Sequence, residues 1–105
     1  MPTRQFGSVT VEVDAEGFLA SADTWNRDVA EGIAQELGIA PLSDRHWKVI
    51  DFCRGDAASQ GQAPGLRRIA KMSGVPMKEL YQLFPKGPGK LAARVSGLPK
   101  PKSCI

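Results

Sequence analysis

The sequence predicts a mainly α-helical (α+β) domain: a small helical bundle with an N-terminal β-hairpin, a helix-turn-helix-like segment and a flexible C-terminal arm. Hydrophobic residues make up 42% of the 105 residues, which is enough for one packed core and too many for a disordered chain. Apolar residues recur at helical spacing along most of the sequence and alternate only near the N-terminus. We therefore expect one globular domain at residues 1–97 and an arm at residues 98–105.

The β-hairpin is expected at about residues 8–20. Ser8–Val13 alternates polar and apolar residues and is rich in β-branched side chains, which predicts a strand. Asp14–Gly17 has the composition of a turn, and Phe18 and Leu19 begin a short return strand. A single hairpin is marginally stable, so it must pack on the helices.

The helices are expected between about residues 24 and 96. The first runs from Thr24 to Leu37, and its apolar residues lie four apart on one face, at Trp25, Val29, Ile33 and Leu37. The second runs from about Asp44 to Ala58 after Ser43 as N-cap. Its inner face is formed by His46, Val49, Ile50, Cys53 and Ala57.

Three shorter helices follow, and a proline or glycine marks most of their ends. Leu66–Ser73 is followed by Gly74, Pro76 suits the first turn of a helix that runs to about Phe84, and Pro88 starts a last helix. Gly97 closes that helix, and Pro99 and Pro101 keep the remaining segment extended.

The composition excludes several classes of protein. No apolar stretch approaches the length of a membrane span, and the residues after Met1 lack the apolar core of a signal peptide, so we expect a cytoplasmic protein without a membrane partner. Cys53 and Cys104 are too few for a disulfide scaffold, and His46 is the single histidine. We expect neither a metal site nor a cofactor.

The charge is distributed unevenly along the chain. Residues 1–65 hold five Lys or Arg and ten Asp or Glu, a formal charge of −5, whereas residues 66–105 hold nine Lys or Arg and only Glu79, a charge of +8. Such a basic half attracts anions, which include phosphates, acidic protein faces and oxidised sulfur species.

One interpretation of the basic half is DNA binding. Arg68–Tyr81 has the rhythm of a helix-turn-helix, with a small Ala70 where the helices approach, and residues 81–86 are similar to the end of the recognition helix in TetR-type repressors. The side chains available to read bases are Met77, Lys78 and Gln82, and DNA use normally requires a dimer. Direct nucleic-acid binding by a regulator is therefore an alternative function.

The C-terminal half also carries a more specific motif. LYQLFPKGPGK at residues 80–90 and GLPKPKSCI at residues 97–105 resemble the DsrC/TusE family of small sulfur-carrier proteins, related to the gamma subunit of dissimilatory sulfite reductase. DAEGFL at residues 14–19 and the segment from Leu42 to Ile50 also resemble the family, so the resemblance covers nearly the whole chain.

The resemblance implies that Cys104 carries sulfane sulfur as a persulfide. In TusE-type members this cysteine receives sulfur from a TusD-like donor and passes it toward a tRNA 2-thiouridine synthase. In DsrC-type members a second cysteine lies eleven positions upstream, and this chain has Ala93 there. We therefore expect a one-cysteine TusE-like member, a relay component rather than a stand-alone enzyme. Partnership with a sulfite reductase-like protein in dissimilatory sulfur metabolism is the alternative.

The residues around Cys104 suit this chemistry. Lys100 and Lys102 favour the thiolate, which the C-terminal carboxylate opposes, and an extended arm of eight residues reaches about 26 Å. The expected docking groups for a partner or an anion are Arg67, Lys71, Lys86, Lys90 and Arg94, together with the two arm lysines. Cys53, Trp25 and Trp47 are expected in the core, and His46 is expected to be packed and hydrogen-bonded.

Overall fold

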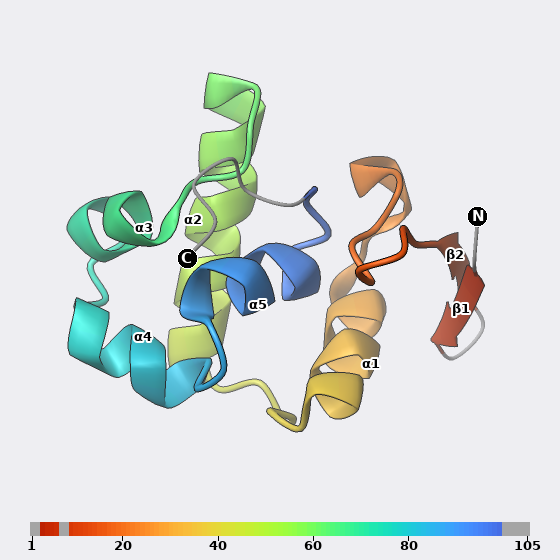
Figure 1. Cartoon of the computed structure of the whole chain (residues 1–105), viewed down its shortest axis with the longest axis horizontal. Coiled ribbons are helices and arrows are strands. Elements are labelled where there is room, and N and C mark those ends of the chain that lie inside the picture. The colour runs from red at the N-terminus through yellow and green to blue at the C-terminus, as the bar shows by residue number, and fades with distance from the viewer. Residues whose placement is uncertain (1–2, 7–8, 100–105) are drawn as a thin grey trace.

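The computed structural model of the chain describes residues 3–6 and 9–99, and it confirms the predicted fold class. The elements in chain order are β1 (Thr3–Phe6), β2 (Val9–Glu12), the 3₁₀ turn η1 (Ala22–Thr24), α1 (Arg27–Leu37), α2 (Asp44–Gln60), α3 (Leu66–Met72), α4 (Met77–Leu83) and α5 (Pro88–Val95). In Figure 1 the hairpin lies beside α1 at one end of the molecule, α3 and α4 lie at the other end, and α2 and α5 lie between them.

The hairpin differs from the prediction. The strand at residues 9–12 pairs with the preceding segment, so that Phe6 lies opposite Val9 in an antiparallel ladder. The predicted turn at residues 14–17 does form, but its return segment makes only an isolated bridge between Val13 and Leu19. The sequence pattern did not predict β1, because this strand has four residues and only Phe6 is buried. Phe6 packs on Gly32 of α1.

Helix α1 also begins later than predicted. The side-chain oxygen of Asn26 accepts a hydrogen bond of 2.9 Å from the N–H of Val29, which starts the helix at Arg27 rather than Thr24. Trp25 thus lies outside α1 and is half-buried. The predicted start of α2 is confirmed, with Ser43 as N-cap, and this helix extends to Gln60.

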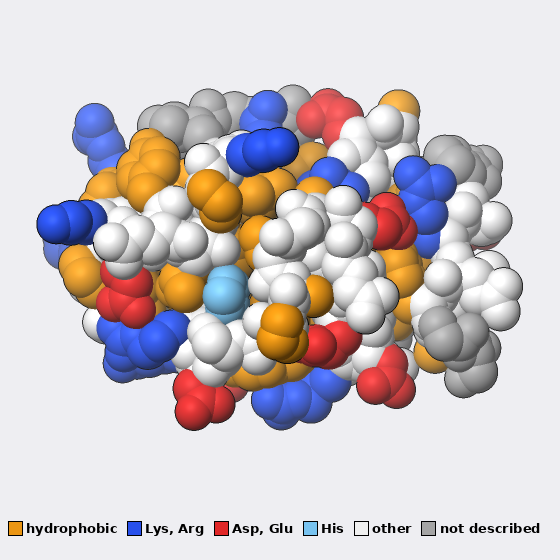
Figure 2. Space-filling model, turned by 90° about the horizontal axis from the view of Figure 1, so that it is seen from below, with side chains coloured by type: hydrophobic (Ala, Val, Ile, Leu, Met, Phe, Trp, Pro, Cys, Tyr) orange, Lys and Arg blue, Asp and Glu red, His pale blue; other side chains and the backbone are white. Residues whose placement is uncertain are grey.

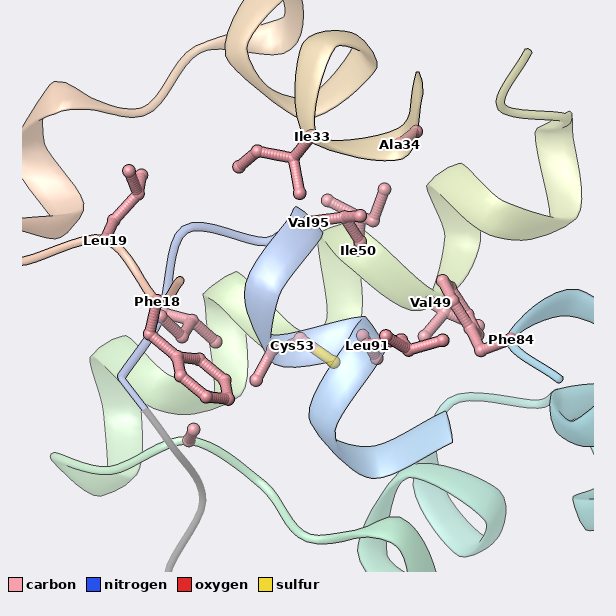
Figure 3. Packing of buried hydrophobic residues seen from close by; sticks show 14 of the residues in the cluster. Phe18, Leu19, Ile33, Ala34, Val49, Ile50, Cys53, Phe84, Leu91 and Val95 are labelled. Atoms are coloured by element: carbon pink, nitrogen blue, oxygen red, sulfur yellow. The ribbon is translucent and has the colours of Figure 1, made fainter. Parts of the chain in front are cut away.

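The core is centred on α2 and α5. Val49, Ile50 and Cys53 of α2 meet Leu91 and Val95 of α5 (Figure 3). The predicted inner face of α2 is confirmed for all of its members except Ala57, which is half-buried. No helix within residues 3–6 and 9–99 is long and apolar enough to cross a membrane.

Candidate functional site

The C-terminal end of α5 is closed by a Schellman motif. The N–H of Leu98 donates to the carbonyl of Ala93 at 3.0 Å, and the N–H of Gly97 donates to the carbonyl of Arg94 at 3.2 Å. Gly97 has φ of 70°, the left-handed conformation that this motif requires. The chain therefore leaves α5 in a fixed direction.

Two side chains from distant segments satisfy the next carbonyls. The indole N–H of Trp25 donates to the carbonyl of Val95 at 2.7 Å, and Nη1 of Arg54 donates to the carbonyl of Ser96 at 2.8 Å. The Arg54 guanidinium also lies over the Trp25 ring, 4.1 Å from its centroid. We call Trp25, Arg54 and residues 96–98 the arm base.

The boundary of the predicted arm needs a correction. Leu98 was assigned to the arm, but its side chain is only 4% exposed and belongs to the core cluster. Its backbone N–H also completes the Schellman motif. Leu98 is therefore part of the body, and the first exposed residue after the body is Pro99.

A hollow of about 340 Å³ adjoins the arm base. Leu98 and Pro99 line one side, and the end of α2 with the following loop lines the other. Asp23 and Arg54 are its charged residues, and burial lowers the pKa of Arg54 while the nearby Asp23 carboxylate opposes that shift. Sequence reasoning missed this grouping, because it brings together side chains more than 30 positions apart.

The first cysteine lies deep in the core, as predicted. Cys53 is 1% exposed, and burial raises the pKa of its thiol to about 12. A pKa raised this far keeps the thiol protonated at neutral pH, whereas the thiolate is the nucleophilic form. We therefore expect Cys53 to be a poor nucleophile in the folded protein.

The predicted carrier thiol lies in the segment that the structure does not describe. Cys104, Lys100 and Lys102 are all outside residues 3–6 and 9–99, so their roles stay predictions. Ala93, where the family resemblance predicts the second cysteine of DsrC-type members, is 2% exposed on α5. Within the described ranges there is also no group of three or more His, Cys, Asp or Glu arranged to hold a metal ion.

The predicted docking cations occupy three different environments. Arg67 and Lys71 are exposed and one turn apart on α3, and neither forms an ion pair within the described part of the chain. Lys86 and Lys90 are exposed before and on α5. Arg94 differs, because its half-buried guanidinium packs against Gly17 and its Nε is buried without a hydrogen-bond partner among the described residues.

His46 has a structural role in this fold, as predicted. Its Nδ1 accepts a hydrogen bond of 3.1 Å from the N–H of Ser43, which is possible only if Nδ1 carries no proton. Its Nε2 therefore carries the proton and donates to the carbonyl of Leu83 at 3.0 Å. The imidazole ties the start of α2 to the end of α4, and both of its nitrogens are occupied.

Comparisons with known proteins agree with this architecture. The family model described as DsrC like protein matches residues 5–105. The dissimilatory-type sulfite reductase subunit gamma of Nitratidesulfovibrio vulgaris (strain Hildenborough) is 43% identical over 94 residues, covering 90% of each chain. Sulfurtransferase TusE of Escherichia coli O6:H1 is 38% identical over 107 residues, covering 95% of this chain and 97% of the other. The oxidized gamma subunit (DsrC) from Archaeoglobus fulgidus is 32% identical and superposes with a TM-score of 0.85, covering 99% and 100% of the two chains.

Proposed function

The chain belongs to the DsrC-like family, and on this basis we propose that it is a sulfur carrier that accepts sulfane sulfur as a persulfide on Cys104 and transfers it to a partner protein. The relatives are named for sulfur transfer and for a subunit of sulfite reductase, and both names suit a protein that moves reduced sulfur. The carrier needs a donor protein and an acceptor protein, because no described residue builds a reaction centre around a nucleophile.

The observation that carries the proposal is the burial of Cys53. The chain has two cysteines, and one of them is 1% exposed with its pKa raised to about 12. A persulfide carrier needs an accessible thiolate. Cys104 is the remaining candidate, and it lies five residues beyond the exposed Pro99, which directly follows the arm base.

The proposed step is a thiolate displacement that needs no added oxidant. The Cys104 thiolate attacks the outer sulfur of a persulfide on the donor, a new S–S bond forms, and the donor thiolate leaves with the electron pair of the broken S–S bond. The acceptor's thiolate repeats the attack on the Cys104 persulfide. Lys100 and Lys102 stabilise the anionic sulfur at both stages.

Mass spectrometry of the intact protein after exposure to sodium polysulfide tests this proposal. We expect one sulfur atom to be added to the wild type and removed by reductant, no addition to Cys104→Ser, and normal addition to the control Cys53→Ala. Sulfur on Cys53, or a Cys104→Ser protein that still gains sulfur, would refute the assignment.

The pathway is a finer proposal. We infer a relay toward tRNA 2-thiouridine, supported by Ala93, which leaves the chain without the second thiol of DsrC-type proteins. The alternative is partnership with a sulfite reductase-like protein, which the 43% identity to a sulfite reductase gamma subunit favours. Deleting the gene and measuring tRNA 2-thiouridine by liquid chromatography with mass spectrometry separates them, because only the first pathway predicts loss of that nucleoside.

A further inference from the structure

We propose that the exposed surface of α3 and α4 is a docking site for an acidic protein face with an apolar centre. This surface, called the α3–α4 face below, consists of Arg67, Lys71, Met72, Lys78 and Tyr81. The inference rests on the proposed function, since its occupant is the donor protein that loads Cys104.

The α3–α4 face exposes apolar side chains that the fold does not use. Met72 is 53% exposed and Tyr81 is 48% exposed, and they are the two large hydrophobic side chains that are exposed among the described residues. Both belong to the two short helices at one end of the molecule (Figure 1). At this end Figure 2 shows hydrophobic side chains bordered by those of Lys and Arg. Methionine, tyrosine and arginine are enriched in the centres of protein interfaces.

The charge of the α3–α4 face is positive and is not neutralised within the described part of the chain. Glu79 is the only carboxylate on α3 or α4, and Arg45 of α2 already binds it with two hydrogen bonds of 2.6 and 2.7 Å. Arg68 is similarly paired with Asp56 of α2, at 2.7 and 2.8 Å. The three remaining cations, Arg67, Lys71 and Lys78, have no ion-pair partner in residues 3–6 and 9–99. The complementary surface is therefore acidic.

The α3–α4 face is held rigidly by the core beneath it. Ile69 of α3 and Leu80 of α4 are 1% and 0% exposed, and His46 fixes the last carbonyl of α4. The two ion pairs to α2 hold the outer edges of both helices. A rigid surface loses little conformational entropy when it binds, which favours docking without rearrangement.

The chemistry of the exposed side chains favours a protein over DNA. Specific base contacts come mainly from Arg and Lys to guanine and from Asn and Gln to adenine, and α4 presents only Lys78 and Gln82 of these types. The exposed large apolar side chains of these helices are Met72 and Tyr81, which do not read base edges through paired hydrogen bonds. An apolar centre with a cationic border matches the anatomy of a protein–protein interface.

The test compares loading of Cys104 by a protein with loading by a small molecule. The probes are a purified, persulfidated TusD-like donor protein from the same organism and sodium polysulfide, with rates followed by mass spectrometry. Tyr81→Ser and Met72→Ser should each slow loading by the protein by about tenfold. Tyr81→Phe, which keeps the ring, should remain within about twofold of the wild type.

A second set of variants tests the positive charge of the α3–α4 face and includes a control at the opposite end of the molecule. Lys71→Gln with Lys78→Gln should slow loading by the protein about three- to tenfold at low salt, and the difference should vanish near 1 M salt. The control Arg4→Gln removes one positive charge, paired with Glu36 at 3.5 Å, from β1 at the opposite end of the molecule, and should change the rate less than about twofold. Polysulfide loading should be equal in all variants, because a small donor needs no docking surface.

The outcomes separate the two proposals. If polysulfide does not load wild-type Cys104, the proposed function fails. The docking inference fails if polysulfide loads Cys104 but the donor protein loads the variants of the α3–α4 face as fast as the wild type. It also fails if polysulfide loads Cys104 but the donor protein loads neither the wild type nor any variant. It also fails if a 30-base-pair DNA duplex binds the wild type and not the double lysine variant, or if a dimer forms that depends on Tyr81.

Discussion

Gly97→Ala tests whether the arm base is as tightly packed as its geometry indicates. Gly97 has φ of 70°, and a Cβ there would lie 2.5 Å from Cδ1 and 2.7 Å from Cβ and Cγ of Trp25. An L-residue in the left-handed region costs about 1–2 kcal/mol, and overpacking of this kind costs about 1–3 kcal/mol more. Trp25 cannot move away freely, because its indole N–H is bonded to the carbonyl of Val95. We expect a loss of about 2–5 kcal/mol in the free energy of unfolding.

The matched control is Gly61→Ala at the end of α2. Gly61 has φ of 77°, nearly the same backbone conformation, but a Cβ there would meet no atom within 4 Å. This variant should lose only the conformational part, about 1–2 kcal/mol. Urea denaturation followed by tryptophan fluorescence gives both values. If Gly97→Ala were no less stable than Gly61→Ala, the contact between Gly97 and Trp25 would not constrain the arm base.

Three further predictions follow from the structure. Deleting residues 99–105 should change Tm by less than about 2 °C, whereas deleting residues 98–105 should lower it on the order of 10 °C in a thermal melt, because Leu98 is buried. Iodoacetamide labelling of the native protein between about pH 7 and pH 9 should modify one cysteine. Cys53 should react only after unfolding, because the pKa of its thiol is raised to about 12. Rapid labelling of Cys53 in the native protein would contradict its burial. Arg68 holds the pKa of the Asp56 carboxyl below its ordinary value of 3.8, so the stabilisation from this pair is present above that pH and is lost as the pH falls through the lowered pKa. Asp56→Asn should therefore reduce the acid sensitivity of urea unfolding below about pH 4, and an unchanged pH profile would exclude this contribution.

The sequence predicted the helices well because their signals are local. Ser43 caps α2 as expected, and the inner face of that helix follows directly from the spacing of Val49, Ile50 and Cys53. The strand at Thr3–Phe6 was missed because it has one buried side chain and little alternation. Its position depends on the packing of Phe6 against Gly32 of α1. A local sequence pattern does not predict a contact between residues so far apart in the chain.

The site was predictable only in part, for the same reason. The burial of Cys53 follows from helical spacing, but the arm base depends on contacts between residues 70 and 42 positions apart. The sequence predicts Trp25 within the first helix, whereas it lies before α1 and donates to the carbonyl of Val95 at the end of α5. Arg94 is among the predicted docking cations, and its half-buried guanidinium packs on the turn at Gly17. Composition identifies a cation but does not show whether its side chain packs within the fold or is exposed to a partner.

The structure of the arm base and the core also relates to the different environments of the two cysteines. The carbonyls of residues 93–96 all accept hydrogen bonds from Leu98, Gly97, Trp25 and Arg54, so the end of α5 is satisfied without any contribution from residues beyond Leu98. The same core encloses Cys53, and burial raises the pKa of its thiol. The core therefore uses one of the two cysteines for packing, and this leaves Cys104 as the thiol to which we assign the proposed exchange.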